Sequence, residues 1–223
     1  MSAPVGRAVG GVARPLPRAT VDRLPRYLRA LDSLEAQGVV TTSSVTLSAA
    51  AGVGSAQLRK DLSFLGSHGR RGVGYDVSHL RGRIAAALGV TSRQRVVIVG
   101  IGNLGHALAN YAGFGERGFT VVGLVDVDPA VVGTRVSGLV VRHLDELERL
   151  VDERGATIAV LAVPSSAAQR VCDRVVAAGV GGVLSFSSRE LAVPSGVDLR
   201  TVDVGAELQI LAFHGHRRQS PEV

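Results

Sequence analysis

Three glycines and an aspartate in the second half of the chain have the types and spacing that bind a dinucleotide. Gly100, Gly102 and Gly105 follow a run of apolar, strand-forming residues and open an expected helix. In such a turn the first glycine permits a tight bend, the second lets the backbone approach a pyrophosphate, and the third lets the helix pack against the strand. The helix N-terminus then faces the phosphate charge. This spacing predicts a Rossmann-type nucleotide site.

The next expected strand, 119–128, contains the aspartate that would complete this site. A carboxylate at Asp126 would accept hydrogen bonds from the adenosine ribose and repel a 2′-phosphate, which favours NAD(H) over NADP(H). Asp128 is the weaker candidate, because Asp128-Pro129 is also typical of a helix start.

Catalytic groups beside this site are hard to find in the sequence. An NAD-dependent enzyme would need a general acid or base near the nicotinamide. The single lysine, Lys60, lies in the N-terminal part, and the four histidines beyond residue 91 form no recognisable pair with a carboxylate. Cys172 lies within an expected helix, and the acidic run 145–153 is typical of a solvated helix face. We therefore expect neither a catalytic centre nor a metal site.

Composition and charge indicate what surrounds the site. The chain has 223 residues, of which 46% are hydrophobic, and its one cysteine excludes a disulfide framework. No apolar run approaches the roughly 18 residues of a membrane helix, so we expect a soluble, cytoplasmic protein. Residues 1–90 carry a formal charge of +7 and residues 91–223 carry −1. This asymmetry is expected if the first part contacts a polyanion.

The N-terminal part has the pattern of a helix-turn-helix. Apolar residues at helical spacing predict a helix over 20–37, and Ser43 or Ser44 can cap a short helix that runs through Ala51. A glycine turn follows, and Ser55 is expected to cap a second helix. This helix directs polar side chains away from its leucines, where they can meet base edges and phosphates: Gln57, Arg59, Lys60 and Ser63.

A glycine-rich segment at 68–77 follows this helix. Two short extended arms around Gly72 and Gly74, with Arg70 and Arg71 at the tip, are typical of the wing of a winged helix. Arginines on a wing contact the DNA backbone or enter the minor groove. Together with the charge asymmetry, the wing favours DNA binding.

The C-terminal part alternates between strands and helices, which predicts an α/β fold with a parallel sheet. A helix at 79–89 is expected before the sheet. After Asp128 we expect a helix at 145–154, a strand at 156–162, a helix at 165–178, strands at 180–186 and 199–204, and a final helix at 206–214. The final helix is short and carries an apolar face, which a neighbouring subunit could cover.

The sequence resembles a known protein family. The segments LRKDLSFLGSHGRRGVGYDV, VGIGNLGHALANYAGFGERGF and LVDVDP, in this order, are similar to those of Rex, the redox-sensing transcriptional repressors of bacteria. The resemblance implies a homodimer with an N-terminal winged helix-turn-helix domain, a C-terminal Rossmann-like domain and a domain-swapped last helix. It also implies that the repressor binds double-stranded palindromic operators when free or with NAD+, and that NADH releases it.

The resemblance also assigns roles to individual residues. It implies DNA contacts by Ser55, Gln57, Arg59, Lys60, Ser63, Arg70, Arg71 and Gly72. It implies a pyrophosphate site at Gly100, Ile101, Gly102, Asn103, Leu104 and Gly105, a ribose contact at Asp126, and a nicotinamide site at Val163, Pro164, Tyr111 and Phe213. Arg29, Tyr111 and Asp203 would be polar members of the switch. The chain departs from the family at 185–188, where Ser-Phe-Ser-Ser replaces the usual Asn-Phe-Ala-Pro.

We therefore expect a flexible tail at 1–19, a DNA-binding domain at 20–90, an NAD(H)-binding domain at 91–204 and a dimerising helix and tail at 205–223. Two alternatives remain open at this stage. One is an NAD-dependent oxidoreductase with a basic appendage. The other is a DNA-binding regulator that senses a different nucleotide, such as a coenzyme A ester.

Overall fold

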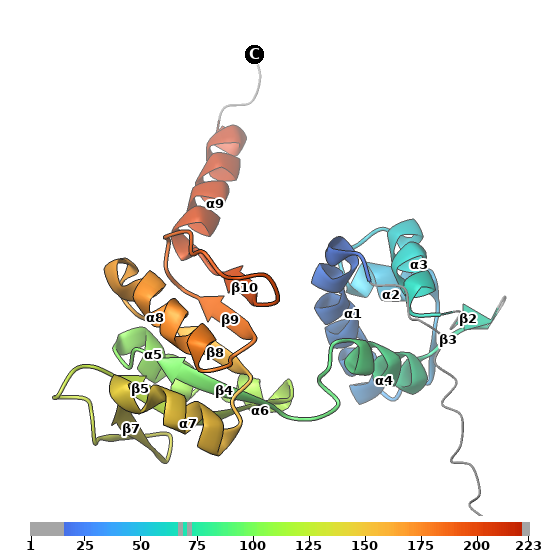
Figure 1. Cartoon of the computed structure of the whole chain (residues 1–223). Helices are drawn as coiled ribbons and strands as arrows, with labels where there is room; N and C mark the ends of the chain where they lie inside the picture. Colours follow the sequence, from blue (N-terminus) through green and yellow to red (C-terminus); the bar gives the residue numbers. More distant parts are fainter. Residues whose placement is uncertain (1–15, 67–68, 71–72, 220–223) are drawn as a thin grey trace, which may run out of the picture. The chain divides into compact units, whose positions relative to one another are not determined.

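The computed structural model describes residues 16–66, 69–70 and 73–219, and it divides into two compact units after Thr91 (Figure 1). Each unit has its own apolar core. Within the described ranges, no helix is both long enough and apolar enough to cross a membrane.

The first unit packs four helices beside a small antiparallel sheet. The helices are α1 (Arg18–Ala36), α2 (Ser44–Ala50), α3 (Ser55–Phe64) and α4 (Val77–Ala87). The strands β1 (Thr41–Thr42), β2 (Gly69–Arg70) and β3 (Gly74–Asp76) pair in the order β1-β3-β2. Leucines from the helices fill the core together with Tyr27 and Ile84, all of them fully buried.

Of the two helix caps predicted in this unit, one is confirmed and one is wrong. Ser43 caps α2, because its side chain accepts a hydrogen bond from the backbone N–H of Thr46. The expectation that Ser55 caps α3 is wrong: Gly54 is the N-cap and Ser55 is the first helical residue. A glycine at the N-cap has no side-chain acceptor, so no side chain of the N-cap bonds the first N–H groups of α3.

The second unit contains a seven-stranded sheet in the order β10-β9-β8-β4-β5-β7-β6. Adjacent strands are parallel, except that β6 runs antiparallel to β7. The strands are β4 (Gln94–Val99), β5 (Phe119–Asp126), β6 (Arg135–Val136), β7 (Leu139–His143), β8 (Ile158–Leu161), β9 (Gly182–Ser185) and β10 (Asp198–Thr201). The helices are α5 (Asn103–Ala109), α6 (Gly113–Glu116), α7 (Leu147–Arg154), α8 (Ser165–Ala177) and α9 (Val204–Gln219).

Both faces of this sheet are apolar. Successive strand residues point to opposite faces, and in β4 the residues on both faces are apolar. Val97 and Val99 of β4 pack with α7 and α8, whereas Val96 and Ile98 pack on the opposite face, which α5 covers in part. Strands buried on both faces are typical of parallel sheets, and they explain the continuous apolar runs in the sequence.

Some elements differ from the sequence-based expectations. The strands β6 and β7 and the one-turn helix α6 were not expected. Asp128 does not start a helix; its Oδ1 accepts a hydrogen bond from the N–H of Ala130 in a turn. The last helix is also longer than expected and begins two residues earlier.

Candidate functional site

The glycine turn lies at the carboxyl end of β4, where the strand order of the sheet reverses between β4 and β8. Gly100 has a φ of +91°, and a Cβ on it would meet the carbonyl oxygen of Ala162 at 2.7 Å. A Cβ on Gly105 would overlap the carbonyl oxygen of Gly100. A Cβ on Gly102 would meet nothing within 4 Å, and this glycine is the N-cap of α5. Two of the glycines therefore make the fold possible, whereas Gly102 opens space for a ligand.

Asp126 ends β5 beside this turn and already accepts three backbone hydrogen bonds. Its Oδ2 accepts a short hydrogen bond from the N–H of Ile101, and its Oδ1 accepts from Val127 at 2.7 Å and Asp128 at 2.9 Å. An ionised carboxylate has about four acceptor positions. One position therefore remains for a ribose hydroxyl, and the other three hold the glycine turn and the β5 end together.

A cavity of about 820 Å³ opens beside these two groups. Among the described residues, its walls come from the carboxyl ends of β4, β5 and β8, from the segment after β5, and from α8 between Ala167 and Arg174. The lining includes five of the expected site residues: Gly100, Gly102, Asp126, Val163 and Pro164. The other expected pyrophosphate residues do not line it: Ile101, Asn103, Leu104 and Gly105 lie in the turn and the start of α5, and Ile101 is buried in the core.

Two arginines of the cavity wall were missed from the sequence. Arg170 and Arg174 lie one helical turn apart on α8 and both line the cavity. Their i, i+4 spacing on the helix that follows β8 was the available signal. Arg174 is held by Glu148 at 3.0 Å and by Asp145 at 3.1 Å, and its hydrogen bond lowers the pKa of Glu148. Both acidic residues are exposed, as expected of a solvated helix face, and they also form ion pairs with Arg174 at the cavity wall.

Serine hydroxyls cluster next to Pro164, where the sequence departs from the family pattern. Ser187 is buried, and its hydroxyl donates to Ser165 Oγ at 3.0 Å. The hydroxyl of Ser185 accepts from the N–H of Ser187 at 3.1 Å, and Ser188 Oγ lies 3.5 Å from Ser165 Oγ. These bonds give the departing segment a defined conformation at the carboxyl ends of β8 and β9.

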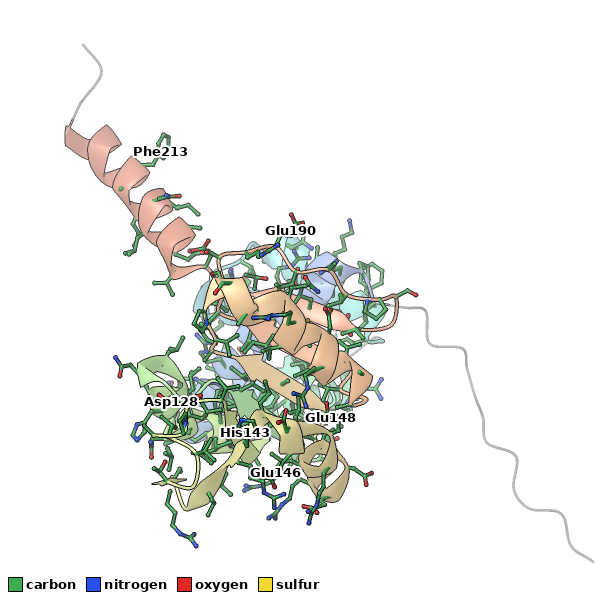
Figure 2. All side chains as sticks on the ribbon, turned by 60° about the vertical axis from the view of Figure 1, so that its left-hand side comes forward. Asp128, His143, Glu146, Glu148, Glu190 and Phe213 are labelled. Atoms are coloured by element: carbon green, nitrogen blue, oxygen red, sulfur yellow. The ribbon has the colours of Figure 1, made fainter. Side chains whose placement is uncertain are left out.

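Three expected ligand and switch residues of the second unit, Tyr111, Phe213 and Asp203, are not among the residues that line its cavity. Tyr111 is half exposed and makes an edge-to-face contact with Phe114, with ring centroids 5.3 Å apart. Phe213 lies on α9, whose ribbon leads away from the sheet (Figure 2), whereas Asp128 is one of the residues that line the cavity. Asp203 precedes α9 and accepts from the N–H of Ala206 at 3.1 Å, and Arg29 is exposed on α1.

The expected DNA-contacting residues are distributed along α3 and the wing. Arg59 and Lys60 are exposed, Ser55 is half buried, and the hydroxyl of Ser63 donates to the carbonyl of Lys60 at 2.7 Å. Arg70 lies on β2, which pairs with β3. Arg71 and Gly72 fall outside the described residues.

Gln57 was expected to point away from the leucine face of α3, and its side chain is instead partly buried. Its Nε2 donates to Asp61 Oδ1 at 2.9 Å. Asp61 is itself completely buried and also accepts from Thr20 at 2.9 Å, from Tyr27 at 2.6 Å and from Arg23 at 2.6 and 2.8 Å. The network joins α1 to α3 through a single carboxylate.

This network was not identified in the sequence. Asp61 lies three residues after Leu58 and one before Leu62, so it occupies the apolar face of α3, and that placement was the available signal. Burial alone would raise the pKa of Asp61, but the hydrogen bonds, of which that from Arg23 is the largest, lower the pKa to about 2. The carboxylate is therefore ionised and balanced by the guanidinium.

Other titratable groups in the described ranges form no cluster of three or more that could hold a metal ion. His143 ends β7, and its ring nitrogen accepts a hydrogen bond from the N–H of Asp145, near Glu146 and Glu148 (Figure 2). Cys172 is buried in α8, and burial raises the pKa of its thiol, which disfavours the reactive thiolate.

Both parts of the chain match known protein families. Residues 15–63 match the family described as "Putative DNA-binding protein N-terminus", and residues 67–189 match the family described as "CoA binding domain". The chain is 58% identical to a redox-sensing transcriptional repressor Rex of Streptomyces avermitilis, over 94% of this chain and 83% of that protein. It is 43% identical to a protein of the same name from Carboxydothermus hydrogenoformans, over 91% of this chain and 97% of that one.

Two solved structures extend the comparison to ligands. The chain is similar to RSP, a Rex-family repressor, in complex with β-NAD+ and operator DNA, with a TM-score of 0.87 and 32% identity over 92% of this chain and 95% of that one. It is also similar to RSP in complex with β-NADH, with a TM-score of 0.82 and 32% identity over 91% of this chain and 95% of that one.

Proposed function

The chain belongs to the Rex family of redox-sensing transcriptional repressors, and from this premise we propose that it binds palindromic operator DNA when free or with NAD+ and leaves it when NADH binds. The observation that carries the proposal is the pairing, in one chain, of a winged helix with a glycine turn and Asp126 beside one cavity. It is a regulator rather than an enzyme, and it acts on operators in the cytoplasm.

The cavity supports NAD(H) as its ligand. The open space at Gly102 lets a pyrophosphate reach the N-terminus of α5, and the remaining acceptor position of Asp126 suits an unmodified ribose. A ribose that carries a phosphate, as in NADP(H) or coenzyme A, would bring its charge next to this carboxylate. We therefore infer that this chain shares the fold of the CoA binding family but not its ligand, and we propose NAD(H) as the ligand.

The proposed assembly is a homodimer that exchanges its last helix. Along α9, Leu208, Leu211 and Phe213 are between 60% and 65% exposed. In the same unit, Leu184 and Phe186 are only half buried on the sheet face that α5 covers in part. Exposed apolar side chains on a helix need a partner surface. We propose that α9 of each subunit covers the sheet face of the other, which would bring Phe213 to the partner's site.

The redox response follows from the difference between the two ligands. NADH carries a neutral nicotinamide ring and NAD+ a cationic one, and burial of an unpaired cation in an apolar pocket is costly. Val163 and Pro164 supply an apolar wall on the proposed nicotinamide side. A ligand shifts a two-state equilibrium only by its differential affinity. NADH would therefore favour the arrangement in which the pocket is closed and the DNA-binding units are misaligned.

The test is fluorescence anisotropy of a labelled Rex-type palindromic duplex, titrated with the full chain at fixed salt, alone and with NAD+ or NADH. Fixed salt is needed because phosphate contacts make the affinity salt-dependent. We expect tight binding that persists with NAD+ and is lost with NADH. A double variant, Arg59→Ala with Lys60→Ala, should lose operator binding and keep NADH binding. Tight binding that ignores both nucleotides would overturn the redox proposal, and no binding at all would overturn the repressor proposal.

A further inference from the structure

The orientation of one side-chain amide on α3 is fixed by chemistry. Gln57 is the third residue of α3, and its Nε2 donates to Asp61 Oδ1 at 2.9 Å. An ionised carboxylate only accepts hydrogen bonds. If the amide were turned over, its oxygen would face the oxygen of Asp61 without a proton between them. The nitrogen of Gln57 must therefore point toward Asp61 and its oxygen away.

The carboxylate that imposes this orientation is itself immobilised from α1. Arg23 binds both oxygens of Asp61 through Nε at 2.6 Å and Nη2 at 2.8 Å, in the bidentate geometry that gives strong and directional pairs. Tyr27 donates to Oδ2 and Thr20 to Oδ1. Because Asp61 is fully buried and bonded on both oxygens, it cannot turn to follow a mobile glutamine.

The side-chain amide of Gln57 still has an acceptor and a donor available for a ligand. With one N–H given to Asp61, Gln57 retains its Oε1 and its second N–H, and neither forms another hydrogen bond within the described part of the chain. An amide oxygen beside an amide N–H matches the N6 donor and N7 acceptor of adenine in the major groove. Guanine presents acceptors at both O6 and N7, which the outward oxygen cannot satisfy. Residues at the N-terminal end of a recognition helix are those that reach base edges.

We propose that Asp61 is a positioning residue that sets base specificity: it orients the amide of Gln57 so that Gln57 selects adenine at one position of each operator half-site. This inference rests on the proposed binding of operator DNA. It assigns the buried ionic network a role in sequence readout in addition to its role in joining α1 to α3.

The experiment is selection from a pool of duplexes with a randomised central region, by the full chain with NAD+ at fixed salt, followed by sequencing of the bound fraction. Wild type, Gln57→Ala and the control Gln37→Ala are compared. Gln57→Ala should flatten the preference for adenine at one position per half-site by about tenfold and leave the other positions unchanged. Gln37→Ala removes an exposed glutamine at the end of α1 that bonds Ser33 and no member of the Asp61 network, so it should keep the wild-type preferences.

An additional variant tests the carboxylate directly. In Asp61→Asn the side chain can donate as well as accept, so the Gln57 amide can adopt either orientation and the same position should lose its adenine preference. Since this variant removes the counter-ion of Arg23, whose side chain is 25% exposed, it should lower stability, and the comparison of Gln57→Ala with Gln37→Ala decides the outcome without it.

The outcomes separate the two proposals. Enrichment of no duplex by wild type would refute operator binding itself. Enrichment by wild type with an unchanged profile for Gln57→Ala would overturn only the specificity inference. So would loss of a guanine preference in place of an adenine preference, because guanine would require the opposite orientation of the amide.

Discussion

Gly102→Ala should separate nucleotide binding from folding. A Cβ at this position would meet nothing within 4 Å, and its backbone φ of −72° suits alanine. The change in stability should therefore stay within about 1 kcal/mol, the range of a substitution at a helix N-cap. The new methyl group would, however, project into the cavity at the N-terminus of α5, where a pyrophosphate must approach the backbone.

The size of the binding defect follows from crowding. Forcing an extra methyl group into a close-packed contact costs about 1–3 kcal/mol, and each 1.4 kcal/mol corresponds to a tenfold change in Kd. We therefore expect the Kd of both NADH and NAD+ to rise by about 10-fold to 100-fold. Operator affinity without nucleotide should not change, so the variant should stay on DNA at NADH concentrations that release the wild type.

Two matched substitutions serve as controls. Gly115→Ala in α6 also meets nothing within 4 Å, and it lies outside the cavity lining, so it should leave folding and binding unchanged. Gly105→Ala would overlap the carbonyl oxygen of Gly100 and should destabilise the second unit by roughly 2–4 kcal/mol. The assays are isothermal titration calorimetry for the nucleotides and urea unfolding for stability. Wild-type affinity for NADH in Gly102→Ala would refute the assignment of this turn as the pyrophosphate site.

Three further predictions concern other parts of the chain. The pKa of Asp61 is about 2 in the folded state, below its usual value near 4, so its stabilising contribution is complete above pH 4 and is lost as the pH falls toward 2. The difference in unfolding free energy between wild type and Asp61→Asn, measured by urea unfolding, should therefore shrink by about 2 kcal/mol between pH 5 and pH 2. A difference that stays constant over this range would argue against the ion pair. Asp126→Ala should weaken NADH and NAD+ to a similar extent, measured by calorimetry, because both ligands carry the same adenosine ribose; an effect on one ligand alone would exclude a ribose contact. Leu211→Ser should convert the proposed dimer to monomer in analytical ultracentrifugation without unfolding the chain, since this side chain is 65% exposed in the single chain. A dimer in wild type that persists in this variant would exclude Leu211 from the interface.

Much of the architecture was accessible from sequence because it depends on local patterns. The helix-turn-helix with its wing, the alternation of strands and helices, and the glycine turn all follow from apolar spacing and from positions that only glycine fits. Element boundaries were less accessible. The strand β7 was missed although it has five residues and the predicted strand β8 has four; β7 is placed by its pairing with β5 at three positions, which the local sequence does not show.

The part of the site that the sequence determined is the part built by one continuous segment. Gly100, Gly102 and Gly105 lie in a single strand–turn–helix, so their spacing predicts the turn, whereas the close approach of Gly100 to Ala162 arises from the pairing of β4 with β8. Tertiary structure decided the rest, because a carboxylate or a guanidinium takes its function from neighbours distant in sequence. Packing brings Arg170 to the cavity wall, and packing of α1 against α3 places Asp61 where it holds Gln57, 4 residues away, and partners more than 30 residues away.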